Sequence, residues 1–204
     1  ALEKNVPFKD VYFTSLVRDA QGRKMSKSLG NSPEPIDLIT EYGADAVRFT
    51  ILYIAPLGQD ILYSKEKNEL GRNFANKIWN AGRFLLMNRG SLGEPPTYDL
   101  EGKFTEFNLD YLDLADKWIL SRLHSTTMEL HKAMEEFEIN KVTKDIYDFF
   151  WHDYCDWYVE MIKSRLYGDE PAEVKQAVVA RAVDIYDAAL RMLHPLMPFV
   201  TEEL

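Results

Sequence analysis

A repeating pattern of apolar residues constrains the fold more than any other feature of this 204-residue sequence. From Glu66 onward, apolar side chains recur at three- and four-residue steps, at Leu70, Phe74, Ile78, Ala81 and Leu85. This spacing puts them on one stripe of a helix, and the stripe must be buried against another element. Further amphipathic helices are predicted over residues 111–136, 140–167 and 172–194. Four long helices of this kind favour an antiparallel bundle.

Residues that favour helix ends support these bounds. Asn140 can cap the third long helix and Gly168 can end it, while Pro171 can open the fourth and Pro195 can end it. Between the first two long helices, residues 90–110 contain three glycines and two prolines, which predicts a long connection.

The first part of the chain has a different character. Residues 10–18 are rich in β-branched and aromatic side chains, which predicts a strand. Pro35 suits the first turn of a short helix that Gly43 can end in the left-handed conformation, and a second helix follows at 44–55. The predicted fold class is therefore mainly α, with a small α/β piece at residues 1–64 and the helix bundle at residues 65–204.

Composition excludes several classes of protein. The single cysteine, Cys155, rules out a disulfide framework and fits a reducing compartment. His152 lies three residues before it, but no second pair accompanies them, so no metal site is expected. No apolar run is long enough to predict a membrane span. Since the chain starts at Ala1 and has no tail, we expect a piece of a longer protein.

Charge is unevenly distributed along the chain. The formal net charge is −9, but residues 1–31 and 66–90 each carry +3, whereas residues 91–204 carry −12. No highly basic tail is present for binding nucleic acid. An RNA partner would therefore have to be bound through local features, because the acidic body repels phosphates.

One short polar segment has a pattern that suits phosphate chemistry. Lys24 and Lys27 lie three residues apart, with serines between and after them, and Gly22 and Gly30 flank the group. Ammonium groups on a mobile loop can close over a polyphosphate and then release it. From the residues alone, an ordinary basic surface turn remains the alternative.

The complete string indicates a family. Residues 24–31 read Lys-Met-Ser-Lys-Ser-Leu-Gly-Asn, which resembles the KMSKS signature of class I aminoacyl-tRNA synthetases. Other stretches resemble the valyl members of that class, above all Arg-Asn-Phe-Ala-Asn-Lys-Ile-Trp-Asn-Ala at residues 72–81. The remaining similar stretches are 43–49, 58–60, 118–123, 150–158 and 194–204. The first signature of the class, HIGH, does not occur in this sequence.

The resemblance implies a function for the loop. It implies part of an enzyme that activates valine with ATP and Mg²⁺ and charges its tRNA, with no cofactor tightly bound to this piece. It further implies a cytoplasmic monomer without membrane contact, inactive as an isolated piece. Lys27 is the expected catalytic residue, assisted by Lys24, and the expected ATP-binding residues are Lys24, Met25, Ser26, Lys27 and Ser28. The alternatives are the same piece of an isoleucyl enzyme and a helical interaction domain without RNA binding.

The first long helix is the candidate RNA-binding element. Asn73, Lys77, Asn80 and Phe84 share one face of it, and Arg72, Asn76 and Arg83 lie beside that face. Amides can pair with base edges and an aromatic ring can stack on an unpaired base. The resemblance implies that this region meets the anticodon loop of tRNA. The alternative is a solvated surface with Phe84 turned into the core.

A string of aromatic residues at 149–158 invites an RNA-stacking interpretation, but core packing is favoured. The predicted buried stripe comprises Val142, Ile146, Phe149, Trp157 and Met161. Four aspartates on the same helix make it a poor phosphate binder.

Overall fold

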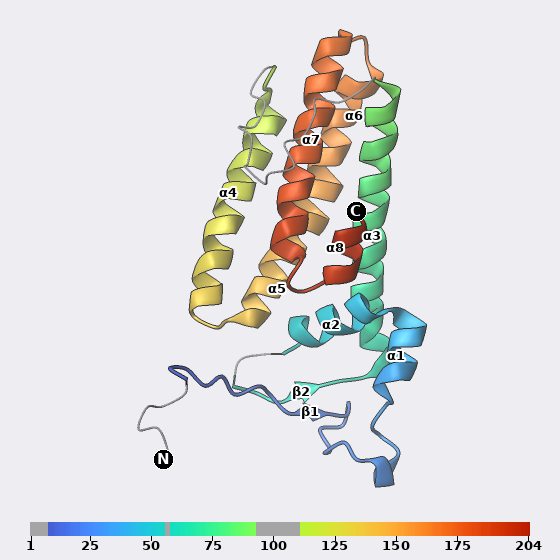
Figure 1. Cartoon of the computed structure of the whole chain (residues 1–204), viewed down its shortest axis with the longest axis vertical. Coiled ribbons are helices and arrows are strands. Elements are labelled where there is room, and N and C mark those ends of the chain that lie inside the picture. The colour runs from blue at the N-terminus through green and yellow to red at the C-terminus, as the bar shows by residue number, and fades with distance from the viewer. Residues whose placement is uncertain (1–7, 56–57, 93–110) are drawn as a thin grey trace, which may run out of the picture.

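The protein is described by a computed structural model that covers residues 8–55, 58–92 and 111–204. Its long helices α3 (Asn68–Ser91), α4 (Leu114–Glu135) and α7 (Ala172–Leu193) run side by side with a helical segment at 139–167 (Figure 1). A small α/β piece covers one end of this bundle (Figure 1). The mainly α fold class and the bundle are therefore confirmed.

The α/β piece contains only a minimal sheet. Strand β1 (Val17–Arg18) pairs in parallel with β2 (Ile61–Leu62), and Val17 faces Ile61 across the pair. The predicted strand at 10–18 is thus wrong for all but its last two residues. The Leu16 carbonyl still accepts from the Ile61 amide (2.8 Å), but residues 10–14 have no backbone partner in another described strand, and a strand requires that partner.

Two short helices follow the loop. Helix α1 (Pro35–Tyr42) begins at Pro35 as predicted, and α2 (Ala44–Tyr53) ends two residues before its predicted end. Gly43 separates them with φ +93° and ψ 148°. Its φ is positive, but its ψ is extended, so the predicted left-handed helical conformation is wrong. The chain turns sharply there and continues directly into α2.

The third predicted helix consists of three parts. They are α5 (Ile139–Asp148), a π-helix (Phe149–Tyr158) and α6 (Val159–Tyr167). Gly168 follows α6 and Pro171 immediately precedes α7, as predicted. Asn140 does not cap the third helix, because the helix starts before it; its amide instead donates to the carbonyls of Leu52 and Tyr53. It satisfies carbonyl groups at the end of α2.

The π-helix changes which aromatic side chains are buried. Phe149 is buried as predicted, and Phe150, Tyr154 and Tyr158 are fully buried beside it. Trp157 and Met161 are 58% and 42% exposed, so their prediction as core residues is wrong. A π-helix has wider turns than an α-helix, and this rotates the residues that follow away from the α-helical stripe. A short helix that was not predicted, α8 (Pro198–Glu203), follows α7.

Close backbone packing joins the α/β piece to the bundle. Phe49 of α2 packs against Phe74 of α3, with ring centroids 4.8 Å apart and the ring planes tilted by 40°. Next to this pair, Gly71 of α3 lies directly against the backbone of Ala46, where an added Cβ atom would overlap the Ala46 carbonyl group. Asp45 accepts hydrogen bonds from the first backbone amides of α8. The predicted apolar stripe of α3 is buried here, except that its first member is only partly covered.

A buried ionic cluster around Asp116 joins α4 to α6 and α7. The Asp116 carboxylate, fully buried near the start of α4, accepts hydrogen bonds from Tyr158 (2.8 Å), Arg165 (2.9 Å) and Arg181 (2.6 Å). Arg181 of α7 is also fully buried. Burial alone would raise the pKa of Asp116, but the hydrogen bond from the Asp113 backbone amide, followed by those from Tyr158 and the charged Arg181, lowers it below its ordinary value. Among the described helices, none is both long and apolar enough to cross a membrane.

Candidate functional site

The Lys24–Ser28 segment is a pre-shaped turn. The chain leaves β1, reverses at Gly22 (φ +80°), and forms a 3₁₀ turn at Lys27–Leu29. The Ser26 hydroxyl caps this turn by accepting from the Leu29 amide (3.3 Å), and Gly30 ends it in the left-handed conformation. Such a turn fixes the backbone while leaving side chains free to project.

The five predicted ATP-binding residues divide into two groups. Lys24 and Lys27 are exposed, and neither makes a hydrogen bond or ion pair through its side chain with the described residues. Met25 is partly buried against the apolar cluster around Leu38 and Val47. The hydroxyls of Ser26 and Ser28 are 3.1 Å apart and hydrogen bonded. Met25 therefore anchors the loop, and the two ammonium groups remain available.

Two residues that were not predicted as site residues organise this loop. The Asp19 carboxylate accepts from the backbone amides of Gln21 (3.0 Å) and Arg23 (2.8 Å) and from the Arg23 guanidinium (2.7 Å). The Asn31 amide donates to Asp19 (3.0 Å) and to the Lys24 carbonyl (3.2 Å). Its oxygen accepts from the Ser26 amide (2.9 Å). The Asn31 hydrogen bond, followed by those from Arg23, lowers the pKa of Asp19 to about 2.

The predicted RNA-facing residues of α3 lie on its outer surface. Asn73, Asn76, Asn80 and Arg83 are exposed and make no side-chain contact with the described residues through hydrogen bonds or ion pairs. Arg72 is exposed too, but it pairs with Glu69 (2.5 Å). The structure therefore places three amides and one unpaired guanidinium together on the first long helix.

The other two predicted residues of this face are more constrained. Lys77 forms an ion pair with Asp156, and its ammonium lies 4.7 Å from the centre of the Trp151 ring. Phe84 is half-buried against the core, and Lys163 lies 5.5 Å above its ring. Phe84 is thus partly a packing residue. This agrees with the alternative interpretation, in which Phe84 turns into the core.

The outer surface of α3 also carries apolar residues that were not predicted as site residues. Trp79 is 40% exposed, and Leu86 and Met87 are more exposed still. Of these, only the aromatic ring of Trp79 is of a type on which unpaired bases stack beside a positive charge. The spacing of Trp79 from Asn76 and Arg83, at three and four residues, was a signal that could have found it.

The loop and the α3 surface are separate. The loop lies beyond the α/β end of the bundle, and α3 runs away from it (Figure 1).

No group of three or more metal-ligating side chains is found within the described ranges. Burial raises the pKa of the Cys155 thiol to about 12, so it is not a reactive thiolate at neutral pH.

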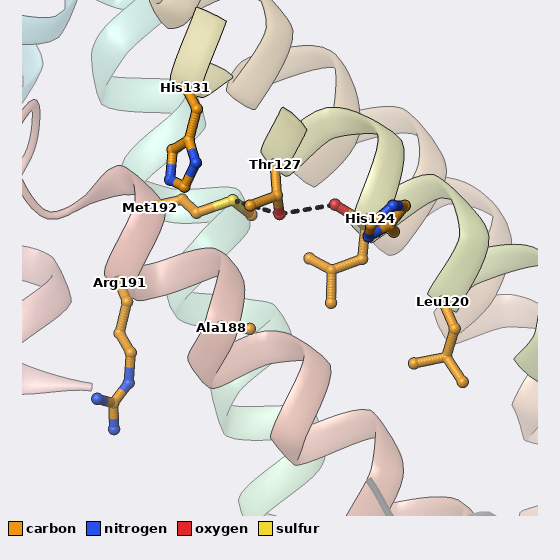
Figure 2. A pocket seen from close by; sticks show the side chains of 8 residues that line it. Leu120, His124, Thr127, His131, Ala188, Arg191 and Met192 are labelled. Atoms are coloured by element: carbon orange, nitrogen blue, oxygen red, sulfur yellow. Dashed lines mark hydrogen bonds between the residues drawn. The ribbon is translucent and has the colours of Figure 1, made fainter. Parts of the chain in front are cut away.

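A groove of about 580 Å³ lies elsewhere, between α4 and α7 (Figure 2). Its lining is largely apolar, with His124 and His131 from α4 and Met192 from α7. Thr127 donates to the Leu123 carbonyl (2.8 Å) and approaches the Met192 sulfur at 3.3 Å. Figure 2 shows Arg191 directed away from the two histidines. None of the predicted site residues lines this groove.

The chain matches two sequence families in succession. Residues 1–64 match the family described as tRNA synthetases class I (I, L, M and V). Residues 116–204 match the anticodon-binding domain of tRNA ligases. The chain has the Lys24–Ser28 segment, below called the lysine loop, at one end of a helix bundle (Figure 1). It belongs to the class I tRNA synthetases.

Within that class the similarity is to valine--tRNA ligases. The chain is 50% identical to the enzyme of Chlorobaculum tepidum over 98% of its length and 49% identical to that of Geobacillus stearothermophilus over 97%. It spans 22% and 21% of those two proteins. The predicted resemblance is confirmed: the chain corresponds to the end of the catalytic domain and the anticodon-binding domain of these ligases.

Solved structures support the fold. Methionyl-tRNA synthetase from Mycobacterium tuberculosis, in complex with methionyl-adenylate, is similar with a TM-score of 0.72 at 20% identity, over 93% of this chain and 36% of that one. The leucyl enzyme of Agrobacterium radiobacter K84 gives a TM-score of 0.65 at 22% identity, over 94% of this chain and 22% of that one. At these identities the comparison concerns the fold alone.

Proposed function

We propose that this chain is the part of a valine--tRNA ligase that stabilises ATP during activation of valine and binds the anticodon region of tRNA. The observation that carries the proposal is the identity of about 50% to valine--tRNA ligases across almost the whole chain. A pre-shaped turn with two unpaired lysines is consistent with it. We place the boundary between the two parts after residue 64, and such an enzyme would act in the cytoplasm.

In the proposed reaction, a carboxylate oxygen of valine attacks the α-phosphorus of ATP and pyrophosphate leaves. A hydroxyl of the tRNA then attacks the acyl carbon of the adenylate, and AMP leaves. Negative charge grows on the phosphate oxygens in the first step, and Lys27 would stabilise it electrostatically, assisted by Lys24. Ser26 and Ser28 would support the turn. Mg²⁺ would be bound largely through the phosphates of ATP, as is usual for this ion.

The proposal predicts a clear difference between this chain and a complete ligase that contains it. The 204-residue chain should show no valine-dependent exchange of pyrophosphate into ATP, because its sequence lacks the HIGH signature. The complete ligase should show exchange. Activity of the purified chain alone would contradict the proposed division of the active site, and a complete ligase that activated isoleucine in preference to valine would contradict the proposed substrate.

The proposed anticodon surface predicts two distinguishable effects on tRNA binding. Asn80→Ala should reduce the preference for a valine anticodon over an altered anticodon by about three- to tenfold, the equivalent of one hydrogen bond. Arg83→Ala should weaken binding of both RNAs and lower the slope of log affinity against log salt by about 0.7, because one phosphate contact is lost. The measurement is a titration of the chain with both tRNAs at several salt concentrations.

Lys132→Ala is the matched control for that titration. Lys132 is exposed on α4, so its loss removes the same charge from a different face. It should change the affinity for neither RNA appreciably. Equal affinity of the chain for both tRNAs, unaffected by Asn80→Ala and Arg83→Ala, would exclude α3 as the recognition surface and favour the interaction-domain alternative.

A further inference from the structure

Asp19 and Asn31 join the two ends of the Lys24–Ser28 loop. Asn31, just after the loop, binds the Lys24 carbonyl at its start and the Ser26 amide at its centre. Asp19, before the loop, receives the same Asn31 amide and both the backbone and the side chain of Arg23. Two side chains twelve residues apart, hydrogen bonded to each other, thus hold the backbone of residues 21–26: Asp19 holds the segment just before the loop and Asn31 holds the loop itself.

These contacts use backbone atoms of the loop and leave its ammonium groups free. Asp19 is only 7% exposed, and four hydrogen-bond donors surround its carboxylate. Its charge is therefore satisfied by donors of residues 21, 23 and 31. No hydrogen bond joins Asp19 or Asn31 to the side chain of Lys24 or Lys27 among the described residues.

We infer that Asp19 and Asn31 are positioning residues, which form a clasp that sets the loop backbone and thereby the place of the Lys27 ammonium. The inference rests on the proposed function for its catalytic consequence, but the clasp itself is a property of this chain. A lysine on an unclasped loop would sample many positions, and small misplacement of a stabilising charge is costly to a reaction rate.

The first test measures the clasp directly. Asn31→Ala should raise the hydrogen-exchange rate of the Ser26 amide by about tenfold or more, because that amide loses its acceptor. The Arg23 amide should exchange faster in Asp19→Ala for the same reason. Gln21→Ala is the matched control, since it removes only an exposed contact with Arg23. The far-ultraviolet circular dichroism and thermal midpoint of the bundle should stay unchanged in all three variants.

A charge exchange separates the specific contact from a general loss of structure. Asn31→Asp puts a second carboxylate beside Asp19 and should loosen the loop more than Asn31→Ala does. Combining it with Asp19→Asn restores one carboxylate and one amide, so Ser26 protection should return toward that of the unaltered chain. Non-additivity of this kind is expected only for residues in contact.

The catalytic consequence is tested in a complete ligase that carries this chain. Asn31→Ala should lower the kcat of valine-dependent pyrophosphate exchange by about ten- to a hundredfold while leaving the KM for valine unchanged. The charge-exchanged pair should recover part of that loss. Normal kcat and normal Ser26 protection in Asn31→Ala, in an enzyme that Lys27→Ala inactivates, would overturn the clasp and leave the proposed function intact. Full activity of Lys27→Ala would instead overturn the proposed function.

Discussion

Lys27→Ala should lower the kcat for adenylate formation by about 10²–10³ in a complete ligase that carries this chain, with little change in the binding of valine. The reason is that Lys27 would meet charge that develops only in the transition state, so its loss raises the barrier without weakening the ground-state complex. The exposed, unpaired position of its ammonium on the 3₁₀ turn is consistent with that role. The steady-state kcat of valine-dependent pyrophosphate exchange measures the effect, and the KM for valine in the same assay reports its binding.

Two comparisons make this result interpretable. Lys24→Ala should have the same kind of effect but a smaller one, and Lys132→Ala, which removes a remote exposed lysine on α4, should have none. A Lys27→Ala enzyme with kcat near normal would mean that the loop has a structural role only. A raised KM for ATP with unchanged kcat would mean that Lys27 binds ATP equally in the ground and transition states.

Asp116→Asn should lower the free energy of unfolding by about 3–5 kcal/mol. The substitution keeps the size of the side chain but removes the carboxylate charge 2.6 Å from the buried Arg181 guanidinium, and breaking a buried ion pair by removing one partner is strongly unfavourable. Asparagine keeps only one acceptor oxygen, so either the Tyr158 hydroxyl, which donates to Oδ1, or Arg165, which donates to Oδ2, loses its acceptor. Urea denaturation followed by circular dichroism measures the change, which for a chain of this size corresponds to a fall in Tm of roughly 6–20 °C.

Asp187→Asn is the matched control for this buried cluster. Asp187 also pairs with an arginine, Arg191, at 2.8 Å, but both side chains are at least half exposed. Its loss should cost at most about 1 kcal/mol, because water already solvates both partners. A similar, small effect of Asp116→Asn would contradict the assignment of the cluster as a principal tie between the helices.

The same cluster predicts a dependence on pH. Because the pKa of Asp116 is lowered by folding, its contribution to stability is complete above the pKa of an unfolded aspartate, about 3.9, and is lost as the pH falls through the lower folded value. The difference in stability between the unaltered chain and Asp116→Asn should therefore shrink on acidification below about pH 4. A difference that stayed constant down to pH 2 would contradict this linkage.

The bundle could be predicted from sequence because its signal is local. Residues such as Phe74, Ile78 and Leu85 repeat at helical steps within a single element, and each is buried as expected. The π-helix could not be predicted this way, because the extra residue per turn depends on packing against neighbouring helices. The predicted buried stripe of this helix therefore failed within and after the π-helix, at Trp157 and Met161.

In the candidate sites, too, contiguous residues could be predicted from the sequence, whereas contacts formed only on folding could not. The string at 24–31 identified the lysine loop without any structure, since the residues that carry the chemistry are contiguous. The clasp could not be predicted, because Asp19 and Asn31 meet only after the chain has turned at Gly22. Likewise, the pairing of Lys77 with Asp156 joins residues far apart in the sequence, and no local pattern indicates it.

The contact between Gly71 and Ala46 sets a fixed distance between the two candidate regions. It joins one backbone directly to another, so no side-chain rotation at that point can lengthen or shorten it. An RNA that reached both the lysine loop and α3 would therefore meet two surfaces whose separation does not change. The lysine loop would then have to adjust to RNAs of different shape. Any side chain larger than hydrogen at position 71 would change the separation between the loop and α3.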